Sequence, residues 1–435
     1  MTIVTNILIL VFLLVEVYFL VRLEKRLWNS YYTPVTILAV PYVLVVLLTV
    51  LLPESLGFVS LYYPSLLFWI VGLLLLEVPS ILMSAFYRKT GGNLDMQVST
   101  PHRQWLLTIV ALLLVAVFMV RLRGMVSAQQ VMFGSDEFGD EFAKYGLFGH
   151  LLVFLIGCMI VFFSFIKRKH WLIPVATILS IALLLFVNQV KSWVIIPLLA
   201  GLLLCMMMGK VRMNMRLLAT ISIVGIGIFA ASYLVMFIIV NQTDYSSDMG
   251  RFIGVHVIHY LTSGVLGLSE DMRLGIVETQ DPEIIIAPFV NIVHVLTGEQ
   301  PIDVVNPNYF YINKYTSSVD NVRTFFGELY VFSGPYISIM YIFLFGIFVY
   351  SVRIASLCTQ SVYIISIDAW FCALLFMGWF DFYFYHLRTY EVPAYLLMLH
   401  FMSKFVFKNA KTITWFKQGE KSEKAVVKQG EVELC

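Results

Sequence analysis

The sequence predicts an all-α polytopic integral membrane protein, with about eleven transmembrane helices and one large external loop. The first observation behind this prediction is composition: 60% of the 435 residues are hydrophobic and 13% are charged, whereas soluble domains carry about 25% charged residues. The second is a mean hydropathy of +0.86. The third is that apolar residues form unbroken runs of about 20, the length a helix needs to cross a bilayer, instead of the alternating pattern of a membrane β-barrel.

Each predicted span is an apolar run bounded by polar residues. The spans are expected at residues 2–20, 34–52, 65–86, 104–120, 148–166, 171–187, 193–209, 217–240, 335–352, 362–380 and 392–407. Residues 241–334 form the only long polar interval before the C-terminal end. We therefore predict a single transmembrane domain over residues 1–408 that includes the external loop 241–334, followed by a polar cytoplasmic tail over residues 409–435.

The distribution of basic residues predicts the orientation of the chain. Most of the 29 lysines and arginines lie in alternate loops and in the tail, and loops rich in basic residues are normally cytoplasmic. The N-terminus and the loop 241–334 are then external, and the C-terminus is cytoplasmic. The net charge of +2 gives no indication of nucleic acid binding, and the spacing of the five cysteines indicates neither a metal site nor a disulfide framework.

The external loop contains a predicted helix over residues 251–272. Arg251 and His259 share one face of that helix, and His256 and Tyr260 lie on the adjacent face. Two interpretations stay open. Either the helix lies at the membrane interface with its histidines in water, or it turns Arg251 and one histidine toward a substrate cavity.

The end of the same loop carries a polar group directly before an apolar span. Residues 281–316 are predicted to be irregular, with one short helix near 289–296, and Asn321, Arg323 and Thr324 follow. The guanidinium of Arg323 would fork onto phosphate oxygens at the level of the headgroups. The alternative is that Arg323 simply contacts phospholipid headgroups.

Two short external loops also carry charge. Lys191 lies alone in a tight turn between two spans, and the alternative to a functional role is that it snorkels to lipid phosphate. The loop 381–391 places His386 and Arg388 among aromatic residues, together with two acids. Aromatic residues are ordinary at a membrane interface, but this many ionisable groups in one short loop are not.

Three acidic residues, Glu16, Glu77 and Asp368, fall inside predicted spans. Ionisable groups within a membrane are functional candidates by default. All three fall in the cytoplasmic halves of their spans, away from the external loops. The alternative is a structural role, either protonated or hydrogen-bonded between helices.

Three local motifs resemble those of one known family. The turn NQVKSW is similar to a short motif with a basic residue before a span, where many members have arginine and this chain has Lys191. The stretch HYLTSGVLGLSE is similar to one early in the large loop, and DNVRTFFGELYVFSG resembles the segment that precedes a late span. Arg323 and Gly334 have ten residues between them, a spacing described for these external loops. On these motifs and its architecture, the chain resembles the bacterial oligosaccharide repeat-unit polymerases, the O-antigen and capsule polymerase family.

This resemblance implies a multi-span, lipid-dependent glycosyltransferase of the bacterial inner membrane, related to the O-antigen ligases. It implies that undecaprenyl-pyrophosphate-linked oligosaccharides are both donor and acceptor, and that neither a metal nor a nucleotide sugar is needed. A chain-length regulator protein and a flippase would be its partner proteins in the membrane.

The chemistry of such a transfer assigns roles to the candidate residues. Fixed cations would neutralise the departing diphosphate at low reorganisation cost, and the residues expected there are Arg323, Lys191 and Arg251. A base would take the acceptor hydroxyl proton, and the candidates for it are His259, His386 and Glu328. The residues expected to contact substrate are Asn321, Thr324, Tyr260, Arg388 and Gly334.

Three other functions compete with polymerisation. A flippase or other transporter of lipid-linked oligosaccharide would favour internal repeats, and the sequence has no evident repeat. A ligase that transfers finished glycan to a different acceptor would share nearly the whole mechanism. The third alternative is a non-enzymatic scaffold of an export machinery.

Overall fold

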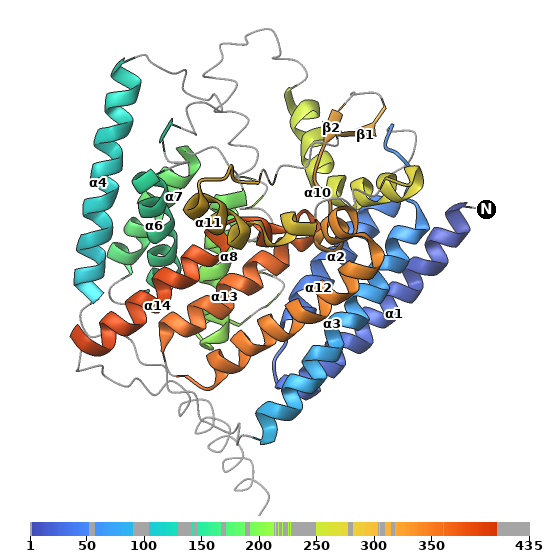
Figure 1. Cartoon of the computed structure of the whole chain (residues 1–435), viewed down its shortest axis with the longest axis horizontal. Helices are drawn as coiled ribbons and strands as arrows, with labels where there is room; N and C mark the ends of the chain where they lie inside the picture. Colours follow the sequence, from blue (N-terminus) through green and yellow to red (C-terminus); the bar gives the residue numbers. More distant parts are fainter. Residues whose placement is uncertain are drawn as a thin grey trace, which may run out of the picture.

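The computed structural model of the chain is built almost entirely of helices (Figure 1). It describes residues 2–51, 57–89, 104–128, 141–142, 146–166, 171–187, 192–212, 214, 216, 220, 225, 227, 249–276, 282–302, 304, 309–314, 318–359 and 361–406. The α-helices are α1 (Thr2–Trp28), α2 (Pro34–Leu51), α3 (Tyr63–Lys89), α4 (Gln104–Ala128), α6 (Gly146–Phe165), α7 (Leu172–Val187), α8 (Ser192–Met207), α10 (Met249–Leu274), α11 (Ala287–Thr297), α12 (Phe325–Leu357), α13 (Val362–Phe376) and α14 (Arg388–Val406). The short elements are the 3-10 helices η4 (Pro282–Ile286), η5 (Met377–Trp379) and η6 (Tyr383–Tyr385) and the strands β1 (Phe310–Asn313) and β2 (Ser318–Asp320).

Seven helices within these ranges are long and apolar enough to cross a membrane, by length and composition. They are α1, α2, α3, α4, α6, α12 and α13, the last continued through η5. Helices α7 and α8 are apolar but have 16 residues each, and α14 covers the last predicted span. The fold is therefore that of a helical polytopic membrane protein. The count of eleven spans is not confirmed, and the predicted span 217–240 lies almost wholly outside the described residues.

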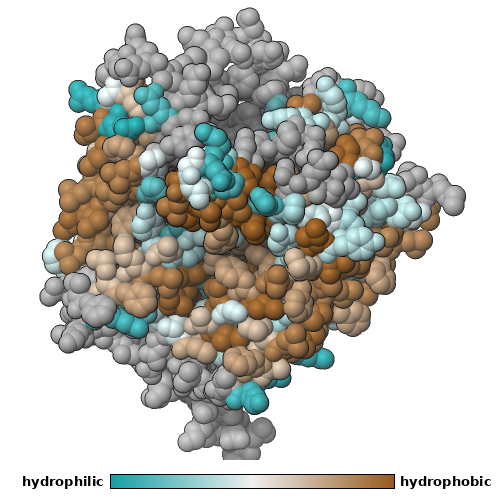
Figure 2. All heavy atoms as spheres, in the orientation of Figure 1, coloured by the Kyte–Doolittle hydropathy of each residue, from teal (hydrophilic) through white to brown (hydrophobic). Residues whose placement is uncertain are grey.

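Large apolar side chains are exposed on the outer faces of these helices. On α1, Val4, Leu8, Phe12 and Phe19 are each more than 60% exposed. Figure 2 shows apolar side chains over much of the visible flanks, with hydrophilic side chains gathered mainly above them. Apolar surface of this extent is costly in water, so lipid is the solvent that fits it.

The predicted external loop 241–334 has more structure than its sequence indicated. The predicted helices near 251–272 and 289–296 are present as α10 and α11. The hairpin β1–β2 was not predicted; it pairs Phe310 with Asp320 and Tyr311 with Val319. Backbone hydrogen bonds from Val59 to Ile312 (3.1 Å) and from Lys314 to Gly57 (2.8 Å) join the loop before α3 to this hairpin. In Figure 1, α10 and the hairpin lie together at the upper end of the helical bundle.

Aromatic packing holds the start of α12 against α2 and α3. The Trp69 ring stacks on Tyr42 with centroids 3.5 Å apart and meets the edge of Phe326 at 4.6 Å. Gly72 leaves room for this contact, because a Cβ there would lie 2.7 Å from the Phe326 ring. The first turn of α12 is thus fixed against α2 and α3.

Helix α12 is kinked at Gly334, which has φ 68° and ψ 171°. This region of backbone conformation is accessible essentially only to glycine, and Pro335 follows with no amide hydrogen to donate. The Ser338 hydroxyl donates to the carbonyls of Gly334 and Leu329, and the Ser333 hydroxyl donates to Leu329. Serine hydroxyls on both sides of the kink therefore donate to backbone carbonyls, and the contact from Ser338 to Leu329 crosses the break. The helix consequently begins at Phe325, well before the predicted span 335–352.

Replacing Gly334 by alanine is expected to destabilise the protein by about 1–3 kcal/mol, because the methyl group forces a side-chain-bearing residue into that conformation. Thermal unfolding of the purified protein in detergent measures the loss. Gly124→Ala on α4 is the matched control, since a Cβ there meets nothing within 4 Å. Equal melting temperatures for Gly334→Ala and the wild type would contradict the strained-glycine account.

Candidate functional site

Three segments far apart in the sequence meet at the upper end of the bundle: α10, residues 318–328, and residues 377–388. Two glycines on α10 allow the approach. A Cβ at Gly264 would lie 2.5 Å from the Phe380 carbonyl oxygen, and one at Gly267 would lie 2.5 Å from the Val322 carbonyl oxygen. Because no side chain fits there, α10 packs directly on the backbones of the other two segments, and their polar side chains are brought together.

Arg323 forms a buried ion pair with Asp271 of α10. The two side chains are 0% and 1% exposed. Arg323 Nη2 donates to Asp271 Oδ1 at 2.9 Å and Nε donates to Oδ2, so the contact is bidentate. The guanidinium carbon lies 4.4 Å from the centroid of the Phe310 ring. The expectation that Arg323 lies open to phosphate or headgroups is wrong for this structure: its charge is already neutralised inside the protein.

Thr324 and Glu328 anchor the start of α12. The Thr324 hydroxyl accepts the amide of Gly327 at 3.2 Å as a helix cap and accepts Trp69 Nε1 at 2.8 Å. Glu328 Oε1 accepts the amide of Arg323 at 3.0 Å, and its side chain is 1% exposed. These two predicted site residues are thus buried in helix-capping contacts that also fix Arg323.

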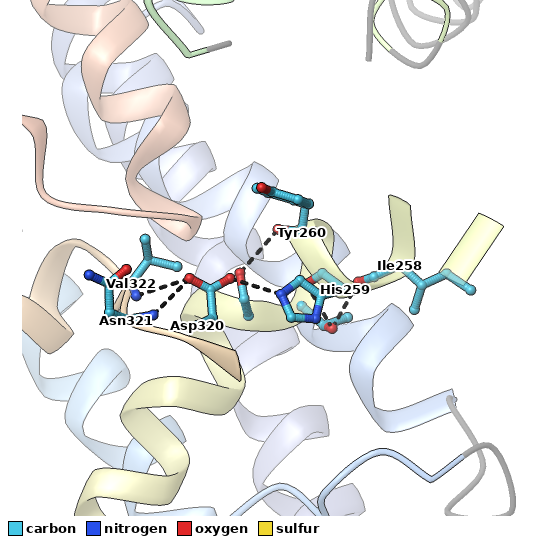
Figure 3. A network of polar contacts seen from close by, with 8 residues as sticks. Ile258, His259, Tyr260, Asp320, Asn321 and Val322 are labelled. Atoms are coloured by element: carbon cyan, nitrogen blue, oxygen red, sulfur yellow. Dashed lines mark hydrogen bonds and ion pairs between the residues drawn. The ribbon is translucent and has the colours of Figure 1, made fainter. Parts of the chain in front are cut away.

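His259 and Asp320 form a second polar pair (Figure 3). His259 Nε2 lies 3.1 Å from Asp320 Oδ2, and Oδ1 of the same carboxylate accepts the amides of Asn321 (2.8 Å) and Val322 (3.3 Å). With Asp320 ionised, Nε2 carries the proton of that bond and Nδ1 is the basic nitrogen. No hydrogen-bond partner for Nδ1 is present among the described residues. His259 is 6% exposed, so the interpretation that it faces water is wrong.

Asp381 brings another carboxyl group to the same region. Its oxygens accept the Tyr385 hydroxyl at 2.8 and 2.9 Å and the Phe382 amide at 2.7 Å. Burial raises the pKa of Asp381 to about 6, although these hydrogen bonds lower it; the charge of Asp320 adds to the rise and that of Arg323 opposes it. The cluster therefore combines one arginine with several carboxyl groups, one of them poised to titrate at mildly acidic pH.

His386 and Arg388 gather around Trp193, near the start of α8. The His386 ring lies 5.5 Å from the Trp193 ring and 4.6 Å from the Tyr385 ring. The Arg388 guanidinium carbon lies 5.7 Å from the Trp193 centroid. Burial, with the charge of Arg388, lowers the pKa of His386, so this histidine is neutral. It adjoins the Asp381 cluster through Tyr385.

An apolar groove of about 200 Å³ backs onto the cluster. Its aromatic lining residues are Phe289, Tyr341, Phe345, Phe348, Phe382, Phe384 and Tyr390. Phe382 is the neighbour of Asp381 in the chain, and Leu329, which also lines the groove, is the neighbour of Glu328. The Phe325 ring packs against two of the lining residues, 5.1 Å from Phe345 and 5.0 Å from Phe382. An apolar chain in this groove would end beside ionisable groups.

The structure brings most of the predicted site residues to one end of the bundle but not all. Tyr260 stacks on Phe380 at 6.1 Å and meets the edge of the His259 ring at 5.6 Å, and the backbone amide of Asn321 donates to the Asp320 carboxylate. Gly334 forms the kink in α12, and its predicted contact with substrate stays a prediction. Lys191 and the side chain of Arg251 lie outside the described residues.

Sequence reasoning missed the acidic partners. Asp271, 52 residues from Arg323, and Asp320, 61 residues from His259, carry no local spacing that predicts either pair. Asp381 did have a signal, since it is a single acid inside an aromatic run. Among the described residues, no group of three or more histidine, cysteine or acidic side chains is placed to hold a metal ion.

Fold and site together define a polytopic membrane protein with a buried ionisable cluster at one end of its helical bundle. Residues 57–409 match a family described as a family of unknown function, DUF6337, and the chain belongs to that family. No curated protein and no solved structure matches the chain.

Removing one partner of the Arg323–Asp271 pair is expected to cost about 3–5 kcal/mol, because it leaves a buried charge uncompensated. Asp271→Ala and Arg323→Ala should therefore unfold at much lower temperature than the wild type. The double variant Asp271→Leu/Arg323→Met should recover part of that loss. The control is Arg273→Ala, which removes a surface pair with Glu270 on the same helix and should cost at most about 1 kcal/mol. Single variants as stable as the control would show that the pair is not buried as described.

Asp381→Asn is expected to gain stability over the wild type as pH rises from about 4 to 6. The pKa of Asp381 is about 6 in the folded protein and about 3.9 in an unfolded chain. The folded state therefore binds the proton more tightly, and the wild type loses about 3 kcal/mol across that interval and no more above it. Thermal unfolding from pH 4 to pH 8 measures the difference. Glu299→Gln, at a 64% exposed side chain, is the control; a pH-independent difference at Asp381 would contradict the buried titration.

Proposed function

We propose that this protein joins lipid-linked oligosaccharide repeat units by glycosyl transfer, as a repeat-unit polymerase. The observation that carries the proposal is the ionisable cluster of α10, residues 318–328 and residues 377–388, buried at one end of an apolar bundle beside an aromatic groove. A lipid-linked sugar combines apolar and charged parts in the same way, because its apolar chain is joined to a charged diphosphate and a polar glycan. The motif resemblance to repeat-unit polymerases supports the same reaction.

In this proposal His259 is the general base. Asp320 holds its Nε2–H, which leaves the Nδ1 lone pair to take the proton of the acceptor hydroxyl. The hydroxyl oxygen forms the new bond to the anomeric carbon of the donor. The bond from that carbon to the diphosphate breaks, and its electron pair leaves with the lipid diphosphate. A single displacement of this kind inverts the anomeric centre.

The cations that meet the diphosphate are proposed to be Arg388 and Lys191, with Arg251 as a further candidate. Arg388 lies over Trp193, and Lys191 precedes Ser192, the first residue of α8. Arg323 takes a different part from the one its sequence indicated. Paired with Asp271, it positions the segment that carries Asp320, and contact with the diphosphate would require that pair to open.

The His259–Asp320 pair gives the direct test in cells. His259→Ala and Asp320→Asn are expected to reduce polymer synthesis by about 10²–10⁴-fold, the usual contribution of a positioned base, while the protein remains inserted in the membrane. The measurement is the glycan ladder of cells that carry only the variant chain. His294→Ala on α11 is the matched control, because its ring contacts only Glu299 and the Gln300 carbonyl in described contacts. Normal-length polymer from His259→Ala would refute the base assignment.

A transporter of lipid-linked oligosaccharide is the second candidate. It is favoured by the ionisable residues inside the spans, since such residues often mark ion pathways. Deletion of the gene separates the two functions. Single repeat units that still reach the cell surface favour the polymerase, whereas their absence favours the transporter.

A further inference from the structure

A second buried polar cluster lies far from the first, where α1, α3, α12 and α13 meet. Arg353 Nη1 of α12 donates to Asp368 Oδ2 of α13 at 2.7 Å, and both side chains are at most 5% exposed. Glu24 of α1 lies beside Arg353, and Glu77 of α3 lies beside Glu24; the two glutamates are 0% and 4% exposed. All four helices are among those long and apolar enough to cross a membrane. The cluster thus places three carboxyl groups against one arginine in an apolar setting.

The two glutamates differ in what surrounds them. Glu24 Oε1 accepts the Ser80 hydroxyl, which in turn accepts Trp28 Nε1 at 2.9 Å. The hydroxyls of Thr33 and Tyr350 and the charge of Arg353 also face Glu24. Among the residues that the structure describes, no donor reaches Glu24 Oε2 or either oxygen of Glu77. The carboxyl of Glu24 faces Glu77, and the Tyr350 side chain lies near both carboxyl groups.

Two carboxylates side by side in an apolar interior cannot both carry charge without a compensating group. Arg353 is already held by Asp368, so it offsets at most part of the charge on Glu24. A proton on Glu77 removes one of the two adjacent negative charges. It gives Glu77 a hydrogen to donate to Glu24 Oε2, and it supplies a partner for two oxygens that otherwise have none.

We propose that Glu24 and Glu77 form a proton-binding site inside the helical bundle, in which one proton is shared between the two carboxyl groups. Glu77 carries the proton. Glu24 stays ionised, held by Ser80 and by the nearby charge of Arg353. This site is separate from the His259–Asp320 cluster and does not depend on the proposed transferase reaction.

Infrared spectroscopy of the purified protein in lipid tests the site, because a carboxylic acid and a carboxylate have separate bands. At pH 7, Glu77→Gln is expected to lose the C=O band of one carboxylic acid relative to the wild type. The double variant Glu24→Gln/Glu77→Gln should lose only carboxylate bands relative to Glu77→Gln. Glu299→Gln is the control, because that glutamate side chain is 64% exposed; its difference spectrum should lose only carboxylate bands and leave the acid band in place.

Several outcomes would overturn the proposal. No acid band lost in Glu77→Gln would mean that both carboxyls are ionised, and a second acid band lost in the double variant would mean two protons instead of one. Disappearance of the band when NaCl replaces a salt of a bulky organic cation would mean that the site binds sodium. If Glu77→Gln does not fold, Glu24→Gln decides the question: the acid band of Glu77 is expected to persist but shift, and an unchanged band would refute the sharing.

Discussion

The ion pair between Arg323 and Asp271 is the contact on which the upper end of the molecule depends. Removing two charges from water costs several kcal/mol for each ion, and only a bidentate geometry with further support offsets that cost. Here the support consists of two parallel hydrogen bonds and the face of the Phe310 ring. Because only this bidentate contact offsets the cost of removing both charges from water, the pair fixes residues 318–328 against α10.

Once residues 318–328 are held against α10, the other polar side chains of the site are brought into contact. Asp320 lies just before Arg323 in the chain and contacts His259, which is on α10 as Asp271 is. The amide of Arg323 reaches Glu328 in the first turn of α12. The two α10 glycines make the approach possible, since any side chain at Gly264 or Gly267 would meet backbone oxygen. An arginine that was predicted to bind phosphate thus serves first to assemble the site, and among the described residues Arg388, which lies over Trp193, is the cation proposed to meet a ligand.

The sequence was a good guide where one dominant force decides the structure. Long apolar runs predicted the membrane helices, and the predicted helices of the external loop are α10 and α11. It was a poor guide where contacts are long-range. The hairpin β1–β2 depends on pairing with the loop before α3, and the partners of Arg323 and His259 lie more than fifty residues away. The start of α12 was misplaced because Gly334 and Pro335 normally end a helix, whereas here the helix continues across a kink that the Ser338 hydroxyl spans by donating to the Leu329 carbonyl.

The most direct test of the proposed transfer is reconstitution of the purified protein in lipid vesicles with a lipid-linked oligosaccharide as the sole substrate. If the cluster beside the aromatic groove performs glycosyl transfer, longer lipid-linked glycans should appear together with one free lipid diphosphate for each bond formed, with neither a nucleotide sugar nor an energy source. Movement of the oligosaccharide across the bilayer, with no elongation and no release of lipid diphosphate, would contradict the account and identify a transporter.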